Sequence, residues 1–213
     1  MKISPTLTEV KEIAKTGKYD ILPVSCEILS DFITPIEAMR ILQNVSTHCY
    51  LLESAQANEA WGRYTFLGYD PKLEINCIDG HMKLGKLSVE TENPSEYIRQ
   101  ILSEYKSPKF DYLPSFTGGL VGYFSYDYLG YKEKSIRGKA KDTEDFKDVD
   151  LMLFDKVIAF DNLCQKIILI ANMSLDAPET GYNKAIVELK QLRELLMHGE
   201  KKQNMGGKLL GEV

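Results

Sequence analysis

Glu53 and Ser54 are the residues whose types and setting point most directly to ligand chemistry. They follow the apolar residues Leu51 and Leu52, so a carboxylate and a hydroxyl stand at the end of an expected strand. A carboxylate can accept hydrogen bonds from a ligand's ammonium group, which would be costly to bury unpaired. Arg63 could donate to a ligand's carboxylate, or could instead pair with Glu53. Together these groups would suit a free amino acid, whereas the simpler interpretation is an apolar strand followed by a polar loop.

The glycine-rich segment 118–122, with the sequence GGLVG, invites a nucleotide-binding interpretation that its context argues against. A phosphate-binding loop places its glycines between a strand and the N-terminus of a helix. Here the glycines lead into the β-type sequence Tyr123-Phe124-Ser125-Tyr126, with no helix signal after it. Because glycine inside a strand more often marks a bulge or a close approach of two backbones, we expect a packing role.

Composition excludes several classes of protein. A chain of 213 residues can bury a sizeable core as one large domain, and 44% hydrophobic with 27% charged residues is typical of a globular protein. The formal net charge of -5 argues against a nucleic-acid-binding surface, which is usually basic. No apolar run approaches the roughly 20 residues that a membrane span requires. We therefore expect neither nucleic acid nor membrane as a partner.

The cysteines and histidines lack the spacing of metal ligands. The four cysteines are far apart and form no C-x-x-C pair, which argues against structural zinc and thioredoxin-type redox motifs. With no signal peptide in the sequence, free buried thiols in a reducing cytoplasm are the expected state. The residues concerned are Cys26, Cys49, Cys77 and Cys164, with His48, His81 and His198.

Capping residues and apolar spacing predict four helices. Two begin with a capping box, in which a threonine and a glutamate satisfy the first free amides, and two have proline at the start. We expect helices from Thr6-Leu7 to Gly17, from Thr34-Pro35 to Val45 with Met39 and Leu42 buried, from Asn93-Pro94 onward, and from Glu179 to Met197 with Tyr182, Ile186, Leu189, Leu192 and Leu196 inward, ended by Gly199.

The remaining apolar segments predict strands that are grouped as hairpins. They cover residues 19–29, 49–53, 63–67, 73–84 around an Asp79-Gly80 turn, 120–126, and 151–171 with a turn at Asp161-Asn162. Because strands and helices do not alternate regularly, a Rossmann fold is disfavoured. The expected fold class is α+β, a largely antiparallel β-sheet with flanking helices.

Four segments carry a resemblance to a known family. They are LLES at 51–54, WGRYTFLG at 61–68, GGLVGYFSYD at 118–127, and the run Pro23-Val24, Glu27-Ile28, Asp31 and Thr34-Pro35. Together they resemble the N-terminal region of anthranilate synthase component I. In that family the LLES glutamate and serine belong to the feedback site for tryptophan, beside the Arg-Tyr-Thr-Phe run. The resemblance therefore implies an effector site of Glu53, Ser54, Arg63, Tyr64, Thr65 and Phe66, with apolar neighbours against the indole ring.

The same resemblance implies a regulatory piece of a larger enzyme. The whole enzyme converts chorismate, with ammonia that a glutamine amidotransferase subunit supplies from glutamine, into anthranilate and pyruvate. Residues 1–199 would form an N-terminal regulatory domain, and 200–213 a linker toward a missing chorismate-binding catalytic domain. That domain carries the catalytic groups and magnesium ligands in the family, so we expect no catalytic residue and no cofactor site in these 213 residues. L-tryptophan, the amidotransferase and the catalytic domain are the implied partners.

Two alternatives remain open at this stage. The chain could be the corresponding part of aminodeoxychorismate synthase component I, whose matching region is usually less similar to LLES and WGRY. It could also be a stand-alone amino-acid-binding module.

Overall fold

The computed structural model describes residues 1–53, 62–135 and 146–202. These residues form α1 (Leu7–Lys15), α2 (Pro35–Val45), α3 (Pro94–Ser103), α4 (Pro178–His198) and the short 3₁₀ helix η1 (Tyr126–Tyr131). The strands are β1 (Ile3–Ser4), β2 (Ile21–Leu29), β3 (Cys49–Leu52), β4 (Tyr64–Tyr69), β5 (Leu73–Ile78), β6 (His81–Leu84), β7 (Leu87–Glu90), β8 (Gly119–Phe124), β9 (Val149–Phe154), β10 (Lys156–Asp161) and β11 (Lys166–Ser174).

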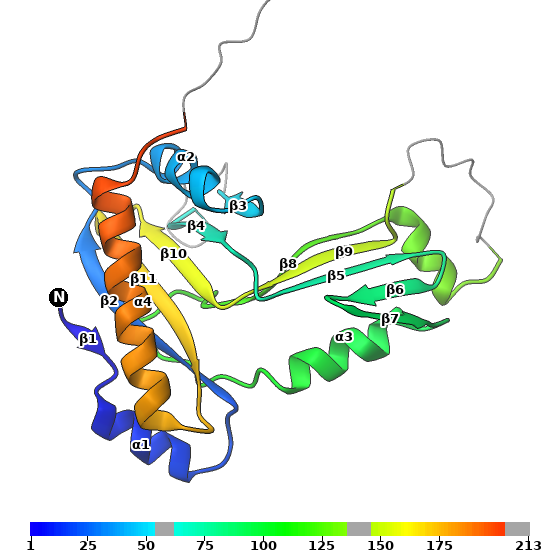
Figure 1. Ribbon diagram of the computed structural model, residues 1–213, viewed down its shortest axis with the longest axis horizontal. Helices are drawn as coiled ribbons and strands as arrows, with labels where there is room; N and C mark the ends of the chain where they lie inside the picture. The colour runs from blue at the N-terminus through cyan, green and yellow to red at the C-terminus, as the bar shows by residue number, and fades with distance from the viewer. Residues whose placement is uncertain (54–61, 136–145, 203–213) are drawn as a thin grey trace, which may run out of the picture.

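The strands form two antiparallel sheets. The six-stranded sheet has the order β1-β2-β11-β10-β4-β3, and the five-stranded sheet has the order β7-β6-β5-β9-β8. Figure 1 shows α1, α2 and α4 beside the first sheet and α3 beside the second. The chain passes between the sheets twice, from β4 to β5 and from β9 to β10, where Asp155 alone separates the two strands. The expected α+β class is confirmed.

The helix ends follow the capping chemistry of the sequence. Both predicted capping boxes are present: Thr6 with Glu9 opens α1, and Thr34 with Glu37 opens α2. Gly17 follows α1 with φ +60°, a left-handed conformation that glycine adopts without strain. These local signals are reliable because each depends on residues within one turn of the chain.

The six-stranded sheet is covered on both faces in its centre. Buried side chains of α1, α2 and α4, such as Val10, Leu42 and Leu189, pack with Leu169 on one face. On the other face Val157, Ala159, Ile168 and Ile170 pack beneath Leu113 and Phe116. Two covered faces explain why β10 and β11 are nearly continuous apolar runs instead of alternating ones.

The described residues cover one face of the five-stranded sheet. Ile75, Cys77, Met82 and Val149 form a cluster to which α3 contributes Ile98. Tyr128 and Tyr131 of η1 pack against the same cluster. The Tyr131 hydroxyl donates to Asp148 at 2.7 Å and accepts from the Gly80 amide at 2.7 Å, so it joins η1 to the β5–β6 turn.

The structure corrects some of the predicted boundaries. The expected hairpin 151–171 is three strands: β9 belongs to the five-stranded sheet, and only β10 and β11 form the hairpin, with Asp161 opposite Lys166 at its end. Tyr126 begins η1 instead of ending a strand, so a short helix does follow the glycine-rich segment. The two-residue β1 and the four-residue β7 were not anticipated. Met39 and Ile186 are partly buried, and Ala38, Ile41 and Ala185 take the fully buried positions.

The close approach expected at the glycines of β8 is confirmed. A Cβ on Gly122 would overlap the carbonyl oxygen of Asp150, and φ there is +153°. A Cβ on Gly118 would lie 2.6 Å from the Asn172 side-chain nitrogen. The glycines therefore let β8 lie close to β9 and to the junction between the sheets.

All four cysteines are free thiols, as expected; Cys26 and Cys77 are buried and Cys49 partly so, but Cys164 is exposed. Burial raises the pKa of the Cys26 thiol to about 11, which makes it a poor nucleophile at neutral pH. Within the described ranges, no helix combines the length and the apolar character needed to cross a bilayer.

Candidate functional site

The predicted effector residues gather at one end of the six-stranded sheet. Leu52, the last residue of β3, lies opposite Phe66 of β4, and Glu53 follows directly. Tyr64, the first residue of β4, lies opposite Asp161 at the end of β10. The pairing of β3, β4 and β10 therefore brings Glu53 and the segment 63–66 to the same end of the sheet. Ser54 lies outside the described residues.

Arg63 is bound by a residue that the sequence had assigned only to a turn. Its Nε donates to Asp161 Oδ1 at 3.0 Å and its Nη2 to Asp161 Oδ2 at 2.6 Å, a bidentate pair. The Asp161 side chain is 4% exposed, whereas that of Arg63 is 36% exposed. Glu53 is exposed and makes no ion pair with any described residue, so the observed partner of Arg63 is Asp161 and not Glu53.

The pair sets the ionisation of both residues. Burial alone would raise the pKa of Asp161, but hydrogen bonds from Arg63 and from the Cys164 amide outweigh it and hold that pKa below its ordinary value. The same pair raises the pKa of Arg63. Asp161 also accepts from the Leu163 amide at 3.2 Å, so the carboxylate organises the β10–β11 turn as well as the start of β4. The ion pair with Asp161 therefore holds the Arg63 side chain in place and joins the start of β4 to the β10–β11 turn.

Alternation along β4 separates the predicted residues onto two faces. Tyr64 and Phe66 lie on the face of the six-stranded sheet that Leu113 and Phe116 cover, here called the outer face. Their ring centroids are 5.8 Å apart, and the Arg63 guanidinium lies 4.9 Å from the Tyr64 ring centre. Thr65 is completely buried and lies opposite Phe160 of the inner core. Its hydroxyl accepts from the Asn162 side chain at 3.3 Å. Thr65 therefore supports the site from beneath and does not share the aromatic face.

The aromatic face extends beyond the residues that the sequence indicated. Phe116, from the segment between α3 and β8, meets Phe66 edge-on at 5.7 Å and Tyr50 at 6.4 Å. Tyr50 in turn meets Phe154 at 4.7 Å. These aromatic side chains form a row from β4 toward β9. Tyr50 and Phe154 are buried, whereas Phe66 and Phe116 are partly exposed and could contact a flat ring.

Asp161, Asn162 and Phe116 are the residues that sequence reasoning missed at this site. The Asp161-Asn162 dipeptide was recognised as a turn, and only the pairing of β10 with β4 places its carboxylate beside Arg63. Phe116 carries no local signal, since it lies in an irregular segment. Both contacts join residues far apart in the chain, which a local pattern does not report.

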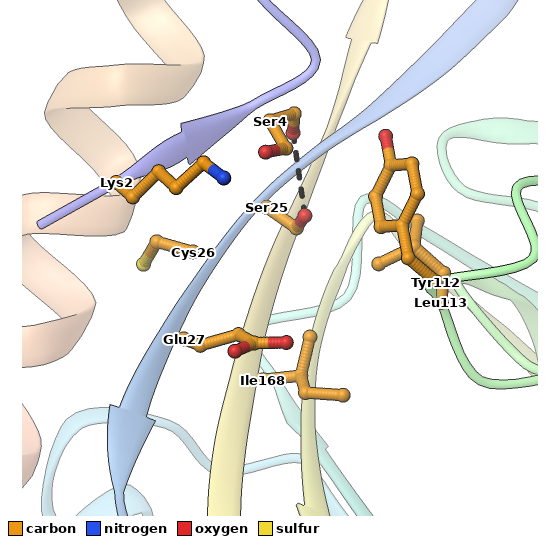
Figure 2. Close-up of a pocket in the computed structure, with 8 residues that line it drawn as sticks. All are labelled: Lys2, Ser4, Ser25, Cys26, Glu27, Tyr112, Leu113 and Ile168. Atoms are coloured by element: carbon orange, nitrogen blue, oxygen red, sulfur yellow. Dashed lines mark hydrogen bonds between the residues drawn. The ribbon is translucent and has the colours of Figure 1, made fainter.

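A cavity of about 420 Å³ lies elsewhere on the same outer face, beside β1 and β2 (Figure 2). Lys2 and Glu27 are its charged lining residues, and Ser25 donates a hydrogen bond to the Ser4 carbonyl at 3.2 Å. Glu27 already pairs with Lys166 at 2.8 Å. None of the predicted effector residues lines this cavity.

The described residues contain no group of side chains arranged as metal ligands. Among them, no three potential ligands from histidine, cysteine, aspartate and glutamate come close enough to hold an ion. The arrangement at the sheet end offers a carboxylate, a buried ion pair and an aromatic wall. Those groups can bind and orient a small ligand.

The relatives of this chain agree with the motifs. Anthranilate synthase component 1 of Acetivibrio thermocellus is 34% identical over 198 residues, which covers 90% of this chain and 39% of that protein. The Pseudomonas aeruginosa protein of the same name is 36% identical over 196 residues, covering 88% of this chain and 39% of that one. No family model matches the chain.

A solved structure shares the fold. The crystal structure of anthranilate synthase component I from Streptococcus pneumoniae covers 78% of this chain and 36% of its own, with 25% identity and a TM-score of 0.51. The chain thus spans about two fifths of the length of the relatives that it matches. In sequence and in fold, it matches the N-terminal region of anthranilate synthase component I.

Proposed function

We propose that this chain is the tryptophan-sensing, non-catalytic part of an anthranilate synthase component I. The observation that carries the proposal is the match to the N-terminal two fifths of that enzyme, with Leu51-Leu52 of the first motif on β3 and Tyr64 to Gly68 of the second on the adjacent β4. The complete enzyme would convert chorismate and glutamine-derived ammonia into anthranilate and pyruvate. An amidotransferase subunit would be its partner, and the cytoplasm its compartment.

The described residues suggest how a tryptophan molecule would be held. Glu53 is exposed and unpaired among them, so its carboxylate is available to an ammonium group. Tyr64 and Phe66 would contact the indole ring from the outer face of the sheet. Arg63 already donates two hydrogen bonds to Asp161, so its role is to hold β4 and the β10–β11 turn in place.

In this proposal, the catalytic residues lie in the part of the enzyme that follows the matched N-terminal region. The family resemblance implies magnesium in the complete enzyme. Among the described residues, no three side chains from histidine, cysteine, aspartate and glutamate are grouped to hold a metal ion. We therefore assign neither a metal site nor a reaction step to this chain. Its contribution is an effector-binding surface and a scaffold for the part that binds chorismate.

The first experiment tests whether the chain serves in this enzyme. A chimera would carry this chain in place of the matched N-terminal region of the Acetivibrio thermocellus protein, and anthranilate would be measured from chorismate and ammonia. We expect the chimera to form anthranilate and the isolated chain to form none. An inactive chimera that is folded would count against the proposal, as would anthranilate formed by the purified isolated chain.

The second experiment tests the effector site in the same chimera. Glu53→Gln removes the charge that would face the ammonium group, so tryptophan binding should weaken by roughly tenfold to hundredfold. Glu90→Gln, at an exposed glutamate of β7, is the matched control and should leave binding unchanged. Calorimetry with tryptophan measures both. Equal affinities for the two variants would remove Glu53 from the site.

A third variant separates sensing from turnover. Ser54→Phe should fill the ligand space or leave a polar ligand group unpaired, which weakens tryptophan binding by roughly tenfold to hundredfold. The chimera's turnover without tryptophan should stay near that of the parent, because chorismate is bound elsewhere. Ser88→Phe on β7 controls for the added ring. A Ser54→Phe chimera inhibited at the parent's tryptophan concentration would contradict this role.

A further inference from the structure

The two sheets have four edges in the described part of the chain, and one of them differs from the rest. β1 has two residues, and β3 and β7 have four each. β8 has six, and the sequence from Gly118 to Tyr126 contains no charged residue and no proline. Soluble proteins usually shorten an edge strand or place charges or proline on it, because its free N–H and C=O groups can pair with another chain. β8 has none of these protections.

Exposed aromatic and aliphatic side chains gather at this same edge. Tyr123 and Phe124 of β8 are 40% and 49% exposed, and Phe146, whose ring meets that of Tyr123 at 6.5 Å, is 62% exposed. In η1, Tyr126 is 81% and Leu129 52% exposed. We call these five residues the β8 surface. Tyr123 and Phe124 lie on opposite faces of β8, and the Phe124 ring is 4.7 Å from that of Tyr128 in η1, so exposed apolar side chains flank the edge on both sides. Exposed apolar side chains that gather in this way mark an interaction site.

Among the residues that the structure describes, no helix covers the face of the five-stranded sheet beside this edge. Helix α3 and the tyrosines of η1 pack on the face of Ile75 and Val149. The opposite face carries Val121, Tyr123 and Met152 near β8, and polar side chains such as Asn76 and Lys83 toward β7. Where a charge does occur near β8, Lys147 neutralises Asp150 at 2.9 Å. The apolar half of the open face therefore adjoins the unprotected edge.

The length of the relatives indicates what covers this region. The chain corresponds to 39% of the Acetivibrio thermocellus and Pseudomonas aeruginosa proteins, so about three fifths of their polypeptide lies outside it. A strand of that polypeptide added to β8 would satisfy the free backbone groups of this edge. The uncharged, apolar strand matches the core of a permanent interface.

We propose that β8 is the docking edge for the catalytic part of the enzyme: a strand of that polypeptide pairs with β8, and its apolar side chains cover the β8 surface. This inference rests on the proposed function, from which it takes the partner. It identifies the surface, which the family match alone leaves open.

Amide hydrogen exchange in the isolated chain and in the chimera tests the docking edge directly. In the isolated chain the outward amides of residues 119–124 should exchange quickly, because no strand covers them. In the chimera they should exchange at least about tenfold more slowly. Amides of β7, the other edge of the same sheet, provide the internal control and should change little.

A pair of variants in the chimera sharpens the test. Tyr123→Lys places a charge in the docking edge and should return the exchange of residues 119–124 toward that of the isolated chain. Leu87→Lys makes the same kind of change at an exposed apolar residue of β7 and should not. Circular dichroism confirms that each variant keeps its secondary structure.

The outcomes separate this inference from the proposed function. An active chimera whose β8 amides exchange as fast as in the isolated chain would overturn the docking edge and leave the function intact. A chimera with protected β8 amides that forms no anthranilate would support the edge and contradict the function. Equal protection of β8 in a dimer of the isolated chain would also overturn the inference, because a second copy would then be the occupant.

Discussion

The two sheets of this protein differ in how completely the chain itself covers them. In the six-stranded sheet, helices cover one face, and Leu113 and Phe116 lie over the centre of the other. In the five-stranded sheet, α3 and η1 cover one face, and the described parts of the chain leave the other face and the β8 edge open. Both sheets are antiparallel and share the β4–β5 and β9–β10 connections. Their difference lies in what is packed on them.

That difference separates two roles. The six-stranded sheet carries an ion pair on a 4% exposed carboxylate, and described segments of this chain pack on both of its faces. The five-stranded sheet presents exposed apolar side chains at its β8 edge, such as Tyr123 and Phe124. A region complete in itself can position a sensing site, whereas an incomplete region needs a partner. The following variants test this contrast, from the largest expected effect to the smallest.

Gly122→Ala should be the most damaging single change in the five-stranded sheet. The added Cβ would overlap the Asp150 carbonyl, and φ of +153° is strained for any L side chain. We expect a loss of about 2–6 kcal/mol of unfolding free energy, the sum of backbone strain and overpacking. Urea unfolding measures it. The control Gly17→Ala has a positive φ but open space around it, and should cost only about 1 kcal/mol; equal losses would mean that β8 relaxes away from β9.

Leu169→Ala should weaken the six-stranded sheet. Leu169 is completely buried between β10, β2 and the helical layer, so truncation leaves a cavity costing about 2–5 kcal/mol. Val121→Ala, on the open face of the other sheet, should cost less than about 1 kcal/mol in the isolated chain. Urea unfolding of both variants checks the contrast. A Val121→Ala loss as large as that of Leu169→Ala would show that the open face is packed after all.

Arg63→Ala should destabilise the chain and change its response to acid. It leaves the buried Asp161 carboxylate unpaired, at a cost of about 1–3 kcal/mol at pH 7. The pKa of Asp161 is lower in the folded state, so its stabilising contribution is present above its ordinary pKa and is lost as pH falls through the folded value. Between pH 5 and the acid limit, the wild type should therefore lose more stability than the variant.

The control for this pair lies on the five-stranded sheet. Lys147→Ala breaks the more exposed pair with Asp150 and should cost less than about 1 kcal/mol. Urea unfolding at a series of pH values checks both variants. Parallel pH curves for wild type and Arg63→Ala would show that the ion pair does not set the pKa of Asp161.

Two tyrosine hydroxyls should give the smallest effects, with different signs. Tyr131→Phe removes a hydroxyl bonded to Asp148 and Gly80 and should cost about 1–2 kcal/mol. Tyr50→Phe removes a buried hydroxyl that has no hydrogen-bond partner among the described residues, and it should be neutral or stabilising by up to about 1 kcal/mol. Thermal unfolding of the two variants checks the pair. A clear loss for Tyr50→Phe would reveal a partner for that hydroxyl.

Much of the local structure could be predicted because its causes are local. The capping boxes of α1 and α2, the Asp79-Gly80 turn and the glycines of β8 each depend on neighbouring residues or on backbone sterics. The division of 151–171 between two sheets could not be predicted in this way. Val149–Phe154 and Lys156–Asp161 are both apolar strands, and nothing local states that the chain changes sheets at Asp155.

The candidate site shows the same division. The sequence by itself determined the motif residues Glu53, Arg63, Tyr64 and Phe66, the antiparallel class, and the match to relatives. Only the tertiary structure decided that Arg63 binds Asp161, that Thr65 turns into the core, and that β8 is an open edge. The physical reason is that side-chain partners and sheet edges are set by strand pairing between distant segments, and pairing energies depend on the whole packed sheet instead of on any one segment.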